Sequence, residues 1–192
     1  MNKKLPSRAS VNEIVLETLK NAHDLLDEAT ILFKYSKFPR SFALSQFCLE
    51  ELGKACLYVD VLNSRDEDWY EDRWNTAMAM MYDHKLKLVQ SSFLHYEMRL
   101  SKLKSVGDSK KKFDLLNTIL PSKEEIEAFN KLKNNSLYVG YKKGKLITLS
   151  KEIDLQLAKK RLNLAKKINE WCQRVFKEDV RRNLKENHLL KA

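Results

Sequence analysis

Two charged clusters in the sequence combine residue types that move protons and hold phosphate groups. The first cluster is Glu50, Glu51 and Lys54, inside an apolar run. Because apolar residues lie on nearly every side of this run, we expect at least one of the two glutamates to be partly buried. Glu50 then pairs with Lys54, four residues further on. This ion pair either fixes helix packing or lines a functional cleft.

The second cluster is Asp83-His84-Lys85-Leu86-Lys87. On a helix, His84 lies about 200° around the axis from both Tyr82 and Leu86, so it faces away from the apolar side that those two residues define. Two interpretations stay open. The cluster is a solvated basic face, or His84 carries a proton while Lys85 and Lys87 contact phosphate groups.

Several familiar catalytic signatures are absent from the sequence. It contains no glycine-rich phosphate loop, no HExxH motif, no paired-cysteine zinc site and no nucleophile elbow. The four histidines do not have the spacing of a metal cluster: His23, His84, His95 and His188. We therefore expect neither a metal nor a cofactor.

Length and composition favour one helical domain over residues 1–192. Hydrophobic residues make up 43% of the chain, enough for a core, while 4 Gly and 3 Pro are too few for a protein rich in turns or linkers. The net charge is +10, with 36 Lys and Arg against 26 Asp and Glu. Such an excess either favours contact with a polyanion such as RNA or serves solubility.

The sequence predicts a cytoplasmic protein. No apolar stretch follows the basic start, so we expect no signal peptide. The most apolar stretch, 41–62, contains four charged residues, which argues against a membrane span. The three cysteines form no CxxC pair and no even set of disulfides.

Helical periodicity and capping signals predict the elements that position these clusters. Ser10 and Ser122 each open an S-x-x-E capping box, and Ser150 is expected to cap the last helix. The predicted helices cover 10–35, 39–63, 70–105, 122–133 and 150 to the mid-180s. A small hairpin is expected over 137–141 and 146–149. The expected fold class is all-α, an up-and-down helical bundle with a β-hairpin inserted before the C-terminal helix.

The third predicted helix carries a regular apolar seam. Its spacing alternates between four and three residues, which is typical of a helix that packs along a bundle neighbour or a second subunit. The seam consists of Tyr82, Leu86, Val89, Phe93, Tyr96, Leu100 and Leu103.

Four segments, taken in order and spacing, resemble the AbiV family of bacterial abortive-infection proteins. They are Arg40–Leu44, Glu50–Ala55, Asp83–Lys87 and Ser136–Val139. The resemblance covers points from about residue 20 to 150. It implies a HEPN-like helical bundle, since AbiV proteins belong to the HEPN superfamily. Many HEPN proteins are homodimeric, metal-independent endoribonucleases that serve as toxins or phage-defence effectors.

The resemblance further implies a catalytic R-x(4–6)-H pair. In that chemistry the 2′-hydroxyl of RNA attacks the adjacent phosphate, His moves the proton and Arg steadies the developing charge. Arg182 and His188 fit with five residues between them, with Asn183 directly after the arginine; Arg181 fits with six. The alternative to a catalytic pair is a basic helix end that interacts favourably with the helix dipole.

A second candidate for this pair lies at Lys133-Asn134 and Tyr138, where Lys replaces Arg and Tyr replaces His. Tyr titrates near 10 and is a poorer base at neutral pH. If this is the ancestral site, catalysis is impaired or uses His84 instead.

The sequence therefore predicts a homodimeric anti-phage effector that cleaves RNA without metal and is triggered during infection by a phage or host protein. The alternative is a non-catalytic HEPN-like module that binds RNA or protein. The expected catalytic residues are Arg182, His188, His84 and Glu51. The expected RNA-binding residues are Lys54, Lys85, Lys87, Lys133, Asn134, Tyr138 and Asn183.

Overall fold

The computed structural model describes residues 5–64, 66–102, 109–138, 140–142, 145–147 and 152–189. The helices within these ranges are α1 (Arg8–Lys34), α2 (Phe38–Leu62), α3 (Glu67–Met81), α4 (His84–Leu100), α5 (Ser109–Ile119), α6 (Lys123–Leu137) and α7 (Leu155–Leu189). Two strands, β1 (Gly140–Lys142) and β2 (Lys145–Ile147), lie between α6 and α7. The all-α prediction is confirmed.

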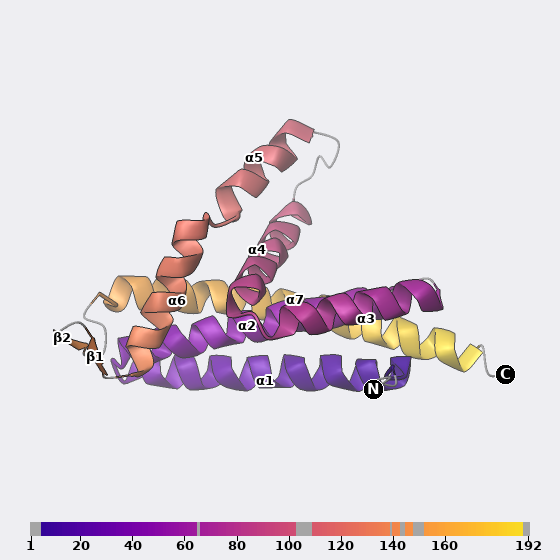
Figure 1. Ribbon diagram of the computed structural model, residues 1–192, viewed down its shortest axis with the longest axis horizontal. Coiled ribbons are helices and arrows are strands. Elements are labelled where there is room, and N and C mark those ends of the chain that lie inside the picture. The colour runs from indigo at the N-terminus through magenta and orange to yellow at the C-terminus, as the bar shows by residue number, and fades with distance from the viewer. Residues whose placement is uncertain are drawn as a thin grey trace.

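Three long helices, α1, α2 and α7, lie side by side and form the body of the molecule (Figure 1). Buried residues recur every three or four positions on α1 and α7, which gives each helix one apolar stripe. The α1 stripe is Val11, Val15, Leu19, Ala22, Leu26 and Ala29. The α7 stripe is Ala158, Leu162, Ala165, Ile168, Cys172, Phe176 and Val180.

The central helix, α2, is buried on most of its sides because α1, α3, α4, α6 and α7 all pack against it. This environment explains why its sequence is apolar almost all round. In Figure 1, α4 and α5 rise steeply from the long helices, and α6 crosses them near one end. None of the described helices is both long and apolar enough to cross a bilayer.

The turn between α1 and α2 makes these two helices antiparallel. Ser36 has a φ of 57°, in the left-handed region that often closes a helix, and the Lys37 N–H donates to the Leu32 carbonyl at 2.9 Å. Pro39 then lies in the first turn of α2, where its missing N–H costs nothing.

The single helix predicted over 70–105 is wrong, because the chain breaks at Tyr82 and Asp83. Asp83 has extended backbone angles, and its carboxylate accepts the N–H groups of Lys85 at 2.7 Å and Leu86 at 3.2 Å. These bonds satisfy two of the free donors at a helix start, so α4 begins at His84 instead of continuing α3.

Other helix ends in the structure also differ from the predicted ones. The N-cap of α1 is Ser7, whose hydroxyl accepts the Ser10 N–H, so the capping box expected at Ser10 is wrong. The capping box at Ser122 is confirmed. The α5 helix was not expected at all. Ser150 lies outside the described residues, and α7 begins after Asp154, which accepts the Leu157 N–H.

The segment between α6 and α7 differs from its prediction. Leu137 closes α6, and Tyr138 caps it, so the first strand expected over 137–141 does not start there. The paired stretches are three residues each, with Gly140 opposite Ile147. The hairpin is therefore not supported in its predicted form.

Candidate functional site

The centre of the candidate site is Glu50, a buried carboxylate of α2 with a side chain only 3% exposed. Lys133 of α6 donates from Nζ to its Oε1 at 2.8 Å, and Nδ1 of His84 on α4 lies 2.8 Å from its Oε2. Gln46, one turn earlier on α2, donates to Oε1 at 3.4 Å. Glu50 thus joins three helices through one buried side chain.

The predicted pair of Glu50 and Lys54 is wrong. Lys54 forms its ion pair with Glu51, three residues before it, and both of these side chains are partly exposed. Lys54 lies between the two glutamates around the helix axis, about 40° from Glu50 and about 60° from Glu51. Angle alone therefore does not choose its partner; Glu50 points instead into the contact with α4 and α6, where His84 and Lys133 hold its oxygens. The expectation that one of the two glutamates is buried is confirmed.

Two features of the chain bring His84 to Glu50. The Asp83 cap starts α4 at His84, which places the imidazole at the helix N-terminus. Gly53 allows α4 to approach α2 closely, because a Cβ at this position would lie 2.6 Å from the Lys87 carbonyl oxygen. Any larger residue would push the two helices apart.

The two nitrogens of the His84 imidazole have different surroundings, because one faces a buried carboxylate and the other is left for solvent. An ionised carboxylate only accepts hydrogen bonds, so Nδ1 carries the proton that faces Glu50. This bond leaves Nε2 as the nitrogen available to a substrate, and the side chain is 55% exposed. A neutral imidazole held in this tautomer is arranged as a proton acceptor at Nε2.

Further cations surround this pair. Lys87 of α4 is buried, and its pKa is lowered first by burial and then by Lys54, while Glu50 and Glu51 act in the opposite direction. Lys133 also lowers the pKa of Lys87. The structure therefore brings five sequence-predicted site residues around Glu50: His84, Glu51, Lys54, Lys87 and Lys133.

The remaining predicted residues near α6 lie at the surface. Lys85 forms an ion pair with Glu127 of α6 at 3.3 Å, with both side chains about half exposed. Asn134 is exposed, and Tyr138 is 67% exposed at the end of α6. The Lys133–Tyr138 candidate is therefore split, since its lysine is buried against Glu50 and its tyrosine faces solvent.

The Arg182 and His188 candidate is not brought to this site. Arg182 is exposed and lies 3.4 Å from Asp179, and Asn183 is buried and donates to the Asp179 carbonyl. Both predicted catalytic residues belong to one continuous helix, α7, in which a separation of six residues places them about 120° apart around the axis. The His188 side chain lies outside the described residues. Figure 1 shows the last turns of α7 at the opposite end of the bundle from α6.

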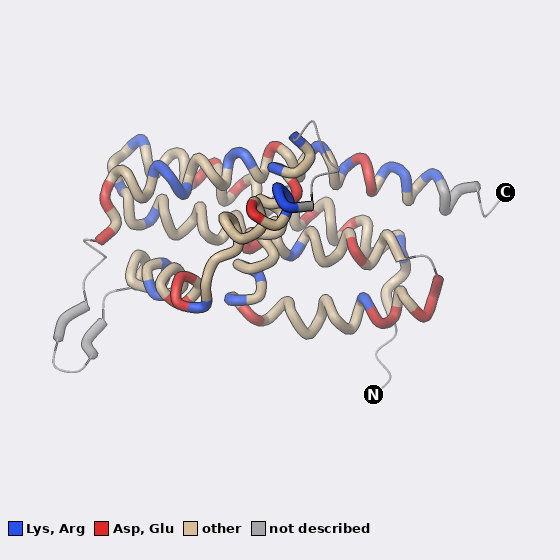
Figure 2. Tube along the Cα trace, turned by 90° about the horizontal axis from the view of Figure 1, so that it is seen from above, with Lys and Arg blue, Asp and Glu red and all other residues tan. Residues whose placement is uncertain are grey.

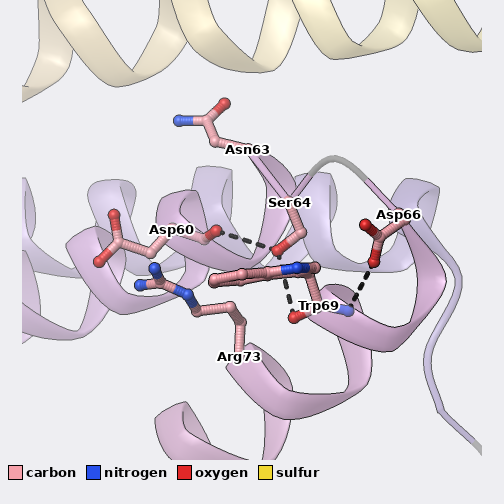
Figure 3. Close-up of a pocket in the computed structure, with 6 residues that line it drawn as sticks. All are labelled: Asp60, Asn63, Ser64, Asp66, Trp69 and Arg73. Atoms are coloured by element: carbon pink, nitrogen blue, oxygen red, sulfur yellow. Dashed lines mark hydrogen bonds between the residues drawn. The ribbon is translucent and has the colours of Figure 1, made fainter.

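A separate pocket of about 480 Å³ lies where α2 meets α3 (Figure 3). The Arg73 guanidinium lies 5.7 Å from the ring centroid of Trp69. The Ser64 hydroxyl donates to the backbone carbonyls of Asp60 and Trp69. Burial raises the pKa of Asp60, while Arg73 lowers it. The pocket is lined by Asp60, Asn63, Ser64, Asp66, Trp69 and Arg73, and none of these six was predicted as a site residue.

Within the described residues, no group of three or more His, Cys, Asp or Glu is placed to hold a metal ion. A comparison with protein families matches residues 10–170 to the HEPN model of AbiV. The chain belongs to the AbiV family. The matched region of this AbiV chain includes Glu50, His84 and Lys133 and ends before Arg182. No curated protein and no solved structure matches the chain.

Sequence reasoning singled out Glu50 but assigned the catalytic role to its neighbour, and it missed one further residue near the candidate site. Glu51 was expected to be catalytic, whereas Glu50 is the buried partner of His84. The further residue is Arg161 of α7, a buried cation whose pKa burial lowers to about 10, while Glu50 opposes this shift. One signal in the sequence pointed to it, because Arg161 is three residues after Ala158 and four before Ala165, which both belong to the apolar stripe of α7.

Proposed function

We propose that this AbiV protein is an anti-phage abortive-infection effector, and that it is a metal-independent endoribonuclease with His84 as its proton carrier. Membership of the AbiV family supports the defence role. The single observation that carries the chemistry is the buried Glu50 carboxylate, 2.8 Å from Nδ1 of a half-exposed imidazole. A carboxylate in this position fixes the tautomer and stabilises the imidazolium that forms when Nε2 takes a proton.

In the proposed reaction, Nε2 of His84 removes the proton from a ribose 2′-hydroxyl. The 2′-oxygen attacks the adjacent phosphorus, the bond to the 5′-oxygen breaks, and a 2′,3′-cyclic phosphate and a 5′-hydroxyl are left. Lys85, next to His84 in sequence, and Lys54 are the cations we assign to the phosphate.

The distribution of charge supports RNA as the substrate. The α7 segment Leu155–Leu189 contains ten Lys and Arg against four Asp and Glu, which is much of the excess behind the net charge of +10. Figure 2 shows basic residues recurring along the described length of this helix. A long cationic surface binds the RNA backbone independently of sequence.

We further propose that the chain works as a homodimer and stays inactive until a phage or host protein appears during infection. The apolar seam supports a dimer, since Leu86 and Phe93 of α4 and Tyr82 just before it are exposed. A second copy would supply the second proton carrier, which returns a proton to the departing 5′-oxygen. A nuclease able to kill its host must be restrained, and this requirement supports a trigger.

The test incubates purified protein with total bacterial RNA in EDTA, with and without extract from infected cells, and maps the new RNA ends. We expect discrete cuts with 2′,3′-cyclic phosphates, lost in His84→Gln and retained in His23→Gln, which changes an exposed histidine of α1. Arg182→Ala and His188→Ala are expected to cut normally. Loss of cutting in these two variants alone would move the site to the end of α7. Intact RNA throughout, with salt-sensitive RNA binding, would support the non-catalytic binding module.

A further inference from the structure

A groove with a cationic lining lies where the C-terminal end of α4 meets the middle of α7. Its volume is about 340 Å³, within the range of sites that take a small organic group. The lining combines three cations, one carboxylate and two apolar side chains: Lys102, Lys167, Arg174, Glu170, Met98 and Trp171. The groove therefore carries an excess of positive charge.

The three cations of the groove are exposed and have no counterion of their own. Within the part of the chain that the structure describes, none of them forms an ion pair, and neither does Glu170 beside them. Their charge also reaches His95, one turn before Met98 on α4. Burial lowers the pKa of His95 first, and Arg99 and Lys167 lower it further. Positive charge that gathers in this way without an internal partner favours a bound anion.

Trp171 gives the groove a flat aromatic wall. The side chain packs against the core and remains partly exposed. Phe176 contacts it edge to face, with ring centroids 6.1 Å apart and ring planes at 70°, and this contact restrains the tilt of the indole. A restrained indole beside cations suits an unpaired nucleic-acid base, which is free to stack, whereas the bases of a duplex are already stacked on one another.

The groove and His84 belong to opposite ends of α4. Met98 is 14 residues after His84, which corresponds to roughly 21 Å along the helix axis. At about 3.4 Å per stacked nucleotide, about six nucleotides cover this distance. One short strand is therefore long enough to lie at His84 and in the groove at the same time.

We propose that this groove binds single-stranded RNA, with phosphates on Lys102, Lys167 and Arg174 and an unpaired base stacked on Trp171. RNA is favoured over an acidic protein segment because basic residues continue along the whole of α7, and a strand carries a phosphate at every nucleotide. The proposal rests on the proposed function for the choice of RNA, but it does not require that the RNA is cut.

The experiment measures binding of the full chain to an unstructured, fluorescein-labelled RNA of about 12 nucleotides, by fluorescence anisotropy at several salt concentrations. The groove variant is Lys167→Gln with Arg174→Gln. The matched control is Lys159→Gln with Lys177→Gln, two exposed cations of the same helix that do not line the groove. We expect the groove variant to bind about 10-fold more weakly, with a salt dependence smaller by about 1.4 in log K against log salt, because two phosphate contacts are gone. The control should bind like the unmodified chain.

Trp171 reports where the RNA lies. The single strand should quench the tryptophan emission of the unmodified chain. Trp171→Phe should lose most of this quenching and keep binding, because phenylalanine also stacks on a base, whereas Trp171→Leu should bind about 5- to 100-fold more weakly. A duplex of the same sequence should cause little quenching. Thermal unfolding checks that the Trp171 variants fold, and the groove variant tests the proposal independently because both of its side chains are exposed.

Three results would overturn the proposal: equal weakening in the groove variant and its control, full quenching in Trp171→Phe, or no RNA binding by the unmodified chain. Binding of polyglutamate in place of RNA, lost in the groove variant, would assign the groove to an acidic protein partner. Groove-dependent RNA binding by a chain that does not cut RNA would support this proposal and contradict the proposed cleavage. Cutting by a chain whose RNA binding ignores the groove would do the reverse.

Discussion

At the scale of single residues, the site depends on one carboxylate that holds two partners, Lys133 and His84. Glu50 is buried, and Nζ of Lys133, also on a side chain only 3% exposed, forms its direct ion pair at 2.8 Å. Neither charge has access to water to replace its partner. The ion pair between Glu50 and Lys133 therefore stabilises the contact of α2 with α6, and it also holds the carboxylate that His84 contacts.

Removing either charge alone should be strongly destabilising. We expect Glu50→Gln and Lys133→Met each to lower the free energy of unfolding by about 3–5 kcal/mol, because each leaves an unpaired buried charge. The double variant should lose clearly less than the two losses added together, by about 1–3 kcal/mol. Urea unfolding of all four proteins measures this coupling.

Glu51→Gln is the matched control, since it changes the neighbouring glutamate in the same helix. Its partner Lys54 is partly exposed, so the loss should stay below about 1 kcal/mol. A loss equal to that of Glu50→Gln, or strict additivity in the double variant, would contradict the assignment of Glu50 as the buried member.

At the scale of elements, sequence periodicity predicted the long helices well because their stripes repeat over many turns. The bounds of α2 and the burial of a glutamate in it followed from local sequence. The contact between Glu50 and Lys133 did not, because the two residues are 83 positions apart and nothing local pairs them. The sequence placed the Glu50 and His84 segments in one family pattern. It did not show which of the two glutamates contacts the histidine.

The break before α4 is a second place where periodicity misled. The apolar seam runs on in register from Tyr82, so the pattern suggested one helix across the break. Asp83 nevertheless favours a helix start through its two bonds to backbone N–H groups, and Tyr82 is left 83% exposed. The spacing of apolar residues alone does not show whether a capping residue inside the repeat will end the helix.

This cap gives an element-scale prediction about activity. Asp83→Ala should lower the free energy of unfolding by about 1 kcal/mol, as loss of an N-cap usually does. Because His84 is the first residue of α4, fraying of this turn should also lower RNA cleavage by roughly 10- to 100-fold. Cleavage of a defined RNA and thermal unfolding measure the two effects.

The chain offers a matched control in Asp66, the N-cap of α3, which accepts the Trp69 N–H at 2.9 Å. Asp66→Ala should lose similar stability but keep its cleavage rate. If both variants lost cleavage equally, the effect would come from overall stability, and the cap would have no particular role in placing His84.

At the scale of the whole molecule, the α4 helix presents different residues to two environments. Its inner side, with Lys87, Leu88, Ser91 and Leu94, packs against the body of the bundle. Its seam side remains partly exposed, with both Leu86 and Phe93 at 38%. His84 lies about 200° around the axis from Leu86, so a partner that covers the seam would approach the proposed catalytic histidine only at the N-terminus of α4, where this helix begins.

We expect the protein to be a dimer in solution, with a light-scattering mass twice the 22.6 kDa of the chain. The double variant Leu86→Glu and Phe93→Glu should shift it to the monomer, because charges buried in an apolar interface cost several kcal/mol. Helix content by circular dichroism should be unchanged, since both side chains are partly exposed. Ile31→Glu, at a 53% exposed apolar position of α1, should leave the dimer intact. A monomeric unmodified chain that still cuts RNA would show that one copy holds the complete site, and the second proton carrier would then have to lie near His84 in the same chain.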